Sequence, residues 1–334
     1  MATVVEGNTA RQSHRGRGSG RGPMQRVKNS YNQYWYAWAM CVPVVLVLLA
    51  VVAYPLIQGI YLTFTDATSV NVGRTIGVNE IPDSYSWVGL KNYTEILTGA
   101  NNQFWPHFVW TVIWTVACVA LTYALGLGLA VAINRQIKAR GFYRMLLILP
   151  WAVPTFVTIF AWRLILADDG VVNQFLIGLG LGLDGPSWLS DPFAQKVAAI
   201  GVNIWCGFPF IMISMLGGLQ SIPRELYEAA EMDGATPWQR FVNVTLPGLR
   251  PVSSTVILLG VIWTFNQFNV IFLLFGGNSD SVQILVTYAY RLFFGQQPQD
   301  YARSATVGIL CLSLLVVFTS VYRRWLKRND QGAL

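Results

Sequence analysis

Side chains that commonly carry out chemistry are few in this chain. Its 334 residues include two histidines, His14 and His107, and four cysteines that stand scores of residues apart inside apolar runs. No cysteine pair has metal-ligand spacing, and a thiol in an apolar run usually behaves as a small hydrophobic group. Adjacent acids in polar loops, such as Asp168 and Asp169, are usually only solvated, and no Ser/His/Asp set can be assembled. We therefore expect no metal site, no catalytic residue and no enzymatic activity.

The composition is that of an integral membrane protein. Hydrophobic residues make up 54% of the chain and charged residues 12%, whereas a soluble domain carries about 25% charged residues. A bilayer is crossed by an apolar stretch of about 20 residues. We predict an all-α integral membrane protein with six transmembrane helices, at about 36–64, 107–133, 142–166, 194–216, 252–275 and 305–322.

Basic residues are distributed unevenly around these six stretches. Seventeen of the 23 Lys and Arg residues lie before the first stretch, after the sixth, or in the loops at 134–144 and 217–251. Short loops rich in Lys and Arg stay in the cytoplasm, so both termini are predicted to be cytoplasmic. The expected organisation is a disordered basic tail at 1–35, a transmembrane domain at 36–322 and a cytoplasmic tail at 323–334. We interpret the first tail as an orientation signal that touches anionic lipid, rather than as a nucleic-acid-binding arm.

The predicted spans contain almost no ionisable groups. Arg163 is the one internal charge, and we expect it to extend outward toward Asp168 and Asp169. Ion-coupled carriers usually need ionisable groups within their spans, and the chain has no G-x-x-x-x-G-K-[ST] phosphate loop. Energy for uphill transport would therefore come from a partner. A self-sufficient channel or secondary carrier is the alternative, although no pore-type filter sequence is recognisable.

The loop between the fourth and fifth stretches predicts two short helices around a glycine corner. Pro223 suits the start of the first helix, and Gly234 suits its end. Thr236 can cap the second helix, with Pro237 at its first position and Gln239 completing a capping box. We expect an amphipathic helix pair that projects into the cytoplasm.

This loop resembles the EAA loop of binding-protein-dependent ABC importers. The pattern is E-A-A, then D-G-A, then L-P, and the matching residues are Glu228, Ala229, Ala230, Asp233, Gly234, Ala235, Leu246 and Pro247. The resemblance implies the type I ABC importer permease fold, in the plasma (inner) membrane of a prokaryote. It also implies that the loop is a coupling helix that docks on a cytoplasmic ATPase. The implied partners are a second permease subunit, two ATPase subunits that bind ATP and Mg²⁺, and an extracytoplasmic sugar-binding protein. This chain itself would hold no cofactor.

Further segments resemble the sugar-permease branch of that family, its maltose/maltodextrin (MalF-like) members in particular. They lie at 87–93, 149–154, 203–209, 265–271 and 276–277. The resemblance implies import of a neutral oligosaccharide by ATP-driven alternating access, with maltose or maltodextrin as the first candidate and trehalose or another sugar as the alternative.

The resemblance also implies a sugar site midway across the membrane. The expected substrate-binding residues are Trp151, Thr155, Asn203, Cys206, Gly207, Gly260, Thr264 and Gln267. Their spacing places each helix's members on one face, and uncharged aromatic, hydroxyl and amide groups suit a neutral sugar. Five of the eight differ from the maltose pattern, which leaves other sugars open. Polar groups in spans also hold helices together, which is the alternative role. Pro150, Pro154 and Pro209 are expected to break helices beside this site.

Overall fold

A computed structural model describes residues 35–36, 39–76, 79–99, 103–135, 138–180, 186–277 and 279–331. The predicted disordered tail at 1–35 lies outside these residues, apart from Trp35, and so do the last three residues of the predicted C-terminal tail. The chain divides into two units, residues 1–58 and 59–334. We describe each unit by itself.

The first unit contains most of one long apolar helix. The helix covers Ala39–Leu62, a length of 24 residues, which is enough to cross a bilayer. It includes a π-helical turn, η1 (Leu49–Ala53), and its last part is α2 (Tyr54–Leu62), which runs into the second unit. Nearly all side chains of its first 20 residues are exposed, as expected for a surface that lipid or other helices cover.

The second unit contains the remaining helices and one small hairpin. In chain order it comprises β1 (Arg74–Ile76), β2 (Asn79–Ile81), α3 (Lys91–Thr98), α4 (Phe104–Asn134), α5 (Arg140–Ala152), α6 (Thr155–Ile165), α7 (Val171–Gly178), α8 (Pro192–Ser221), α9 (Arg224–Met232), α10 (Pro237–Arg240), η2 (Phe241–Thr245), α11 (Leu246–Gly248), α12 (Arg250–Phe265), α13 (Phe268–Phe275), η3 (Asp280–Val282), α14 (Leu285–Phe294) and α15 (Tyr301–Gln331). The two strands pair antiparallel, with Arg74 opposite Ile81.

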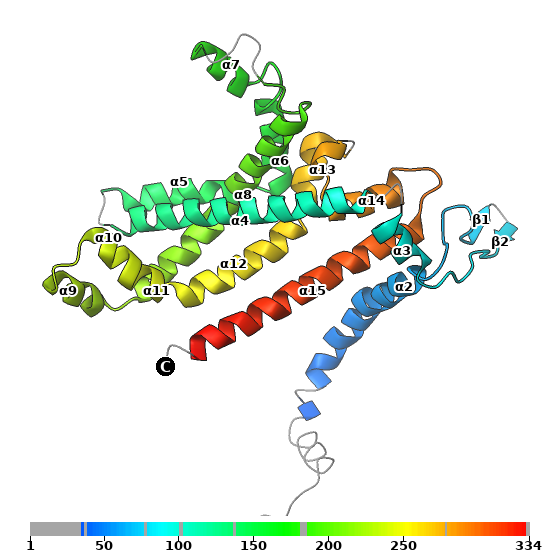
Figure 1. Cartoon of the computed structure of the whole chain (residues 1–334), viewed down its shortest axis with the longest axis horizontal. Coiled ribbons are helices and arrows are strands. Elements are labelled where there is room, and N and C mark those ends of the chain that lie inside the picture. The colour runs from blue at the N-terminus through cyan, green and yellow to red at the C-terminus, as the bar shows by residue number, and fades with distance from the viewer. Residues whose placement is uncertain are drawn as a thin grey trace, which may run out of the picture. The chain divides into compact units, whose positions relative to one another are not determined.

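Helix α4 runs along α8, and α12 packs against both (Figure 1). Small residues allow the close approach of α4 and α8. A Cβ on Gly126 would lie 2.6 Å from the side chain of Ile211, and one on Gly207 would lie 3.2 Å from Thr122. Helices α9 to α11 gather at one end of α8 and α12, while α3 and α14 gather near the first turns of α4 (Figure 1).

Two helix pairs are sharply bent. The pair α5 and α6 bends by 93° at Val153 and Pro154, and the segment 237–248 bends by 68° against α12. Proline has no N–H and disfavours a helical residue before it, which explains the break at Pro154. The described residues contain four helices long and apolar enough to cross a membrane, or up to six if each bent pair forms one span. Six spans therefore stay a prediction.

Two sequence-based expectations about the helices differ from the structure. Pro209 does not break α8, and Pro150 lies inside α5, so Pro154 is the only one of the three prolines at a break. The predicted span at 252–275 consists of α12 and α13, which are separated at Asn266 and Gln267. The outward extension of Arg163 stays a prediction: the residue is exposed, and no ion pair between described residues joins it to the acids at 168 and 169. One proline interrupts few backbone hydrogen bonds, so packing along a 30-residue helix keeps α8 continuous.

Candidate functional site

All eight residues expected at a sugar site line one cavity of about 410 Å³. The cavity is bounded by α4, by the α5–α6 break, by α8 and by the end of α12. Its lining residues are Val119, Thr122, Trp151, Thr155, Asn203, Cys206, Gly207, Phe210, Ile211, Gly260, Ile262, Trp263, Thr264, Asn266 and Gln267.

Trp151 and Thr155 reach the cavity from opposite sides of the helix break. Trp151 lies in the last turn of α5, and Thr155 is the first residue of α6. The expectation that they share one face of a continuous helix is therefore wrong, and the bend between them is what brings both to the cavity. The Trp151 side chain is 58% exposed, which leaves an aromatic surface free.

Asn203, Cys206 and Gly207 line the cavity from α8, at the i, i+3 and i+4 spacing that predicted a shared face. Asn203 is buried, and Cys206 is half-buried. A Cβ on Gly207 would crowd the Thr122 side chain. The glycine thus allows α8 and α4 to lie close together where they border the cavity.

The end of α12 and the break after it bring backbone and amide groups to the cavity. The backbone oxygen of the buried Thr264 accepts a hydrogen bond of 3.0 Å from Trp114 Nε1. Gln267 lies in the break after α12, and its Nε2 donates to Asn203 Oδ1 at 3.5 Å. Asn266, beside it, donates to the backbone oxygen of Ile262. Two of the cavity's amides, on different elements, are therefore already in contact.

The chemistry of this lining suits reversible binding of a neutral polar solute. None of the lining residues is charged. Trp151 and Trp263 offer aromatic faces for a sugar ring, and Phe210 supports Trp263 edge-on with ring centroids 5.0 Å apart. Threonine hydroxyls and side-chain amides can bond sugar hydroxyls. Two neighbouring cavities, of about 300 and 510 Å³, are lined almost wholly by apolar side chains.

Several lining residues were not expected from the sequence. Trp263 and Asn266 are neighbours of expected residues, and a helix break at 266–267 would have pointed to Asn266. Phe210 lies three residues after Gly207 on the same face of α8, so helical spacing could have found it. Thr122 carries no such local signal, because only the packing of α4 against α8 brings it to the cavity. Within the described part of the chain, no group of three or more His, Cys, Asp and Glu side chains could hold a metal ion.

The loop between α8 and α12 has the predicted local structure. Helix α9 ends before Gly234, whose φ of +77° is a left-handed conformation that favours glycine. Gln239 N donates to Thr236 Oγ1 at 3.3 Å, and Thr236 N donates to Gln239 Oε1 at 2.7 Å. This reciprocal pair is the predicted capping box, with Pro237 at the first helical position.

The expected coupling residues form a largely exposed surface on this loop. Glu228, Ala229, Asp233, Gly234 and Pro247 are exposed, and Ala230, Ala235 and Leu246 are half-buried.

Internal contacts hold the loop in shape. Tyr227 and Thr245 share a hydrogen bond of 3.0 Å, and Arg240 Nη1 lies 3.3 Å from Glu231 Oε2. Met232 is 89% exposed and Trp238 is 71% exposed, and the sequence reasoning did not single out either. A fixed surface with acids and large uncovered apolar side chains is typical of a docking element.

Comparison with known proteins identifies the family. A family model described as "Binding-protein-dependent transport system inner membrane component" matches residues 123–330. The chain therefore belongs to this family of inner membrane transport components.

Three curated relatives are similar over most of this chain. The maltose/maltodextrin permease MalF of Salmonella typhimurium is 36% identical over 262 residues, which cover 74% of this chain and 51% of MalF. The maltodextrin permease MdxF of Bacillus subtilis is 33% identical over 302 residues, covering 86% and 67%. The inner membrane ABC transporter permease YcjO of Escherichia coli is 32% identical over 309 residues, covering 92% and 99%. The chain thus spans about half the length of MalF and nearly all of YcjO.

A solved structure supports the fold. A chain of a bacterial ABC transporter that imports the acidic polysaccharide alginate superposes with a TM-score of 0.72, at 23% identity, over 90% of this chain and 99% of that chain. The predicted all-α importer permease fold is confirmed. The number of spans and the docking role of the loop stay predictions.

Proposed function

We propose that this chain is the permease subunit of an ABC importer that carries a neutral oligosaccharide, with maltose or maltodextrin as the first candidate. The observation that carries the proposal is the cavity of about 410 Å³, which gathers all eight expected substrate-binding residues and contains no charge. Two of the three relatives described above are named as maltose/maltodextrin or maltodextrin permeases, which supports this sugar class. Binding would place the sugar between α5, α8 and α12.

Transport in this proposal needs partners. The family description itself names binding-protein dependence, and a structural neighbour was solved with an alginate-bound periplasmic protein. We propose a second permease subunit, two ATPase subunits that bind ATP and Mg²⁺ in the cytoplasm, and an extracytoplasmic sugar-binding protein. The coupling loop at 221–251, whose expected coupling residues are largely exposed, would receive the force of ATP-driven closure. Both termini would be cytoplasmic, which the distribution of Lys and Arg supports.

The uncharged lining favours neutral over acidic substrates. A carboxylated sugar such as those in alginate would enter this cavity without a basic partner, and an unpaired buried charge is costly. Likeness to the alginate importer at 23% identity therefore supports the fold, while the cavity chemistry supports a different cargo.

Competition for uptake tests the proposal. Cells that contain the complete transport system take up radiolabelled maltotriose in the presence of excess unlabelled maltose, trehalose or an alginate oligosaccharide. We expect maltose to compete and alginate not to compete. Competition by trehalose but not by maltose would indicate that trehalose is the transported sugar. Competition by alginate equal to that of maltose would contradict a site for neutral sugars.

A further inference from the structure

The segment that follows α2, residues 63–69, is held between two parts of the chain that are distant in sequence. Thr65 pairs with Trp87 and Thr68 pairs with Asp300 in antiparallel bridges. On the second side, Ala302 N donates to Ala67 O at 3.0 Å. Segment 63–69 is thus fixed both to the W-V-G-L-K-N-Y stretch at 87–93 and to the loop that leads into α15.

Asn92 is the central polar contact of this arrangement. Its side chain is 6% exposed, and its Nδ2 donates to Thr63 O at 2.8 Å and to Thr65 O at 2.7 Å. These carbonyls belong to the turn that directly follows α2, whose own last carbonyls accept from the backbone of residues 63–65. Tyr93, the next residue, donates from its hydroxyl to Thr63 Oγ1 at 3.0 Å. One buried amide therefore holds the turn after α2 against α3.

Aromatic stacking and a second set of hydrogen bonds reinforce the same junction. The ring of Trp87 stacks on Phe64, with centroids 5.1 Å apart and planes 13° from parallel. Asp66 accepts hydrogen bonds from the backbone and hydroxyl of Ser86, and the backbone bond lowers the pKa of Asp66. The carboxylate thus stays ionised and bonded at neutral pH.

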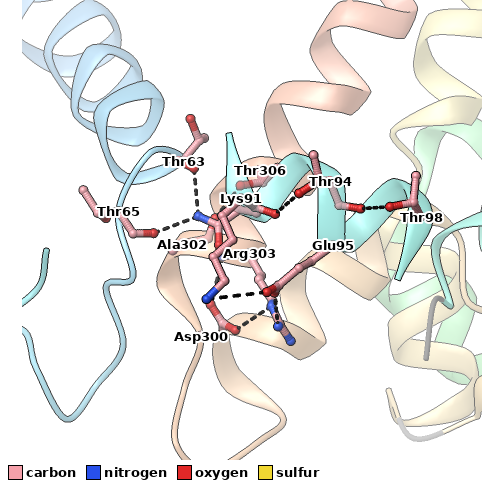
Figure 2. A network of polar contacts seen from close by, with 11 residues as sticks. Thr63, Thr65, Lys91, Thr94, Glu95, Thr98, Asp300, Ala302, Arg303 and Thr306 are labelled. Carbon is pink, nitrogen blue, oxygen red and sulfur yellow. Dashed lines mark hydrogen bonds and ion pairs between the residues drawn. The ribbon is translucent and has the colours of Figure 1, made fainter. Parts of the chain in front are cut away.

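A group of charged side chains joins α3 to the first turn of α15 (Figure 2). Arg303 pairs with Glu95 of α3 and, at 3.5 Å, with Asp300. Lys91 lies one turn before Glu95 on α3, and its Nζ is 3.8 Å from Glu95 Oε1. Ile96 on the same helix is buried in an apolar cluster with Val307 of α15. Both polar and apolar contacts therefore hold α3 against α15.

We propose that residues 63–69, 86–96 and 299–303 form a clasp that makes the end of α2, all of α3 and the start of α15 move as one body during transport. Asn92 is its main positioning residue, because it holds the α2 end from α3. Arg303 is the second, because it ties α3 to α15. This inference rests on the proposed transport function and assigns to the 87–93 stretch a mechanical role outside the sugar cavity.

Substitutions at Asn92 test the clasp in the complete importer, reconstituted in liposomes with its partner subunits. Asn92→Ala removes both donors, and Asn92→Asp keeps the shape but faces two carbonyls with an acceptor. We expect both variants to lower the amount of maltotriose moved per ATP hydrolysed by at least about fivefold, because each loses two hydrogen bonds and a factor of about five corresponds to one. The matched control is Thr94→Ala, because exposed Thr94 donates only to Lys91 O of its own helix. A transport-to-ATP ratio equal to that of Thr94→Ala would overturn the proposal.

A cross-link tests the same inference by holding two segments of the clasp together, and the reduced form of the same variant controls for the lost contacts of Asp300. The bridged pair Thr68 and Asp300 can be changed to Thr68→Cys and Asp300→Cys. Opposed residues of antiparallel strands have Cα atoms about 4.5–5.5 Å apart, which fits a disulfide. If the clasp moves as one body, oxidation should leave uptake at the level of the same variant after reduction. Uptake that stops on oxidation and returns on reduction would show that the clasp opens, and would overturn the proposal even if the Asn92 variants fail to insert. Lack of sugar uptake by the unaltered complex would instead contradict the proposed function.

Discussion

Gln267 shows how one side chain connects two elements of the cavity. It lies in the break after α12 and donates to Asn203 on α8. Its spacing from Gly260 and Thr264 predicted that it shares their helix face, but the structure places it after the end of α12. The break after α12, and not a helix face, therefore brings its amide to the cavity and to Asn203.

Changing Gln267 separates sugar binding from helix packing. We expect Gln267→Ala to raise the KM for maltotriose uptake by about fivefold through loss of about one net hydrogen bond. ATPase activity of the complex without sugar should stay unchanged. The matched control is Gln174→Ala, since exposed Gln174 donates to the backbone oxygen of Asp169 away from the cavity. An unchanged sugar profile in variants at 151, 203 and 267 would indicate that these residues only hold helices together.

At the scale of elements, α9 and its corner were the most predictable part of the chain. Gly234 has the left-handed φ that only a glycine adopts without strain, and Thr236 with Gln239 forms the predicted capping box. Caps and corners depend on residues within one or two turns, so the sequence specifies them directly. Helix breaks were harder to predict from the sequence, because Pro209 is tolerated inside α8 while Pro154 coincides with a sharp bend.

A charge reversal on α9 tests the docking role of this element. Glu228 is exposed, and no ion pair between described residues involves it. We expect Glu228→Lys to abolish sugar uptake and to reduce co-purification of the ATPase at least about tenfold, as for loss of one docked charge contact. Membrane insertion should be normal, since no internal contact is lost. The control is Asp169→Lys, an exposed acid between α6 and α7. Normal uptake by Glu228→Lys would contradict the coupling role.

At the scale of the whole molecule, the proposed function assigns the energy for transport to a partner subunit. The spans of this chain carry almost no ionisable groups, the described residues form no metal cluster, and the exposed apolar side chains of α9 and α10 are uncovered. The family assignment agrees with such a dependent membrane component. A permease of this kind should be inert without its partners.

Reconstitution of this chain alone distinguishes an importer subunit from a self-sufficient carrier. Liposomes that contain only this protein should show no maltotriose flux above empty liposomes, because no ion-coupling group or open filter supplies a path. Addition of the partner permease, the ATPase, the binding protein and ATP should start uptake. Sugar flux through the chain alone would support a channel or secondary carrier.

The sequence by itself determined the membrane class, the approximate positions of the apolar helices, the paired helices of the 221–251 loop and the residue types of the cavity. These follow from local composition and from caps and corners only a few residues long. Only the tertiary structure decided that Trp151 and Thr155 meet across a bend, that Thr122 joins the same cavity, and that Asn92 holds the turn after α2. Such contacts, like the one between Glu95 and Arg303, depend on packing between segments far apart in the chain. No local sequence pattern predicts them.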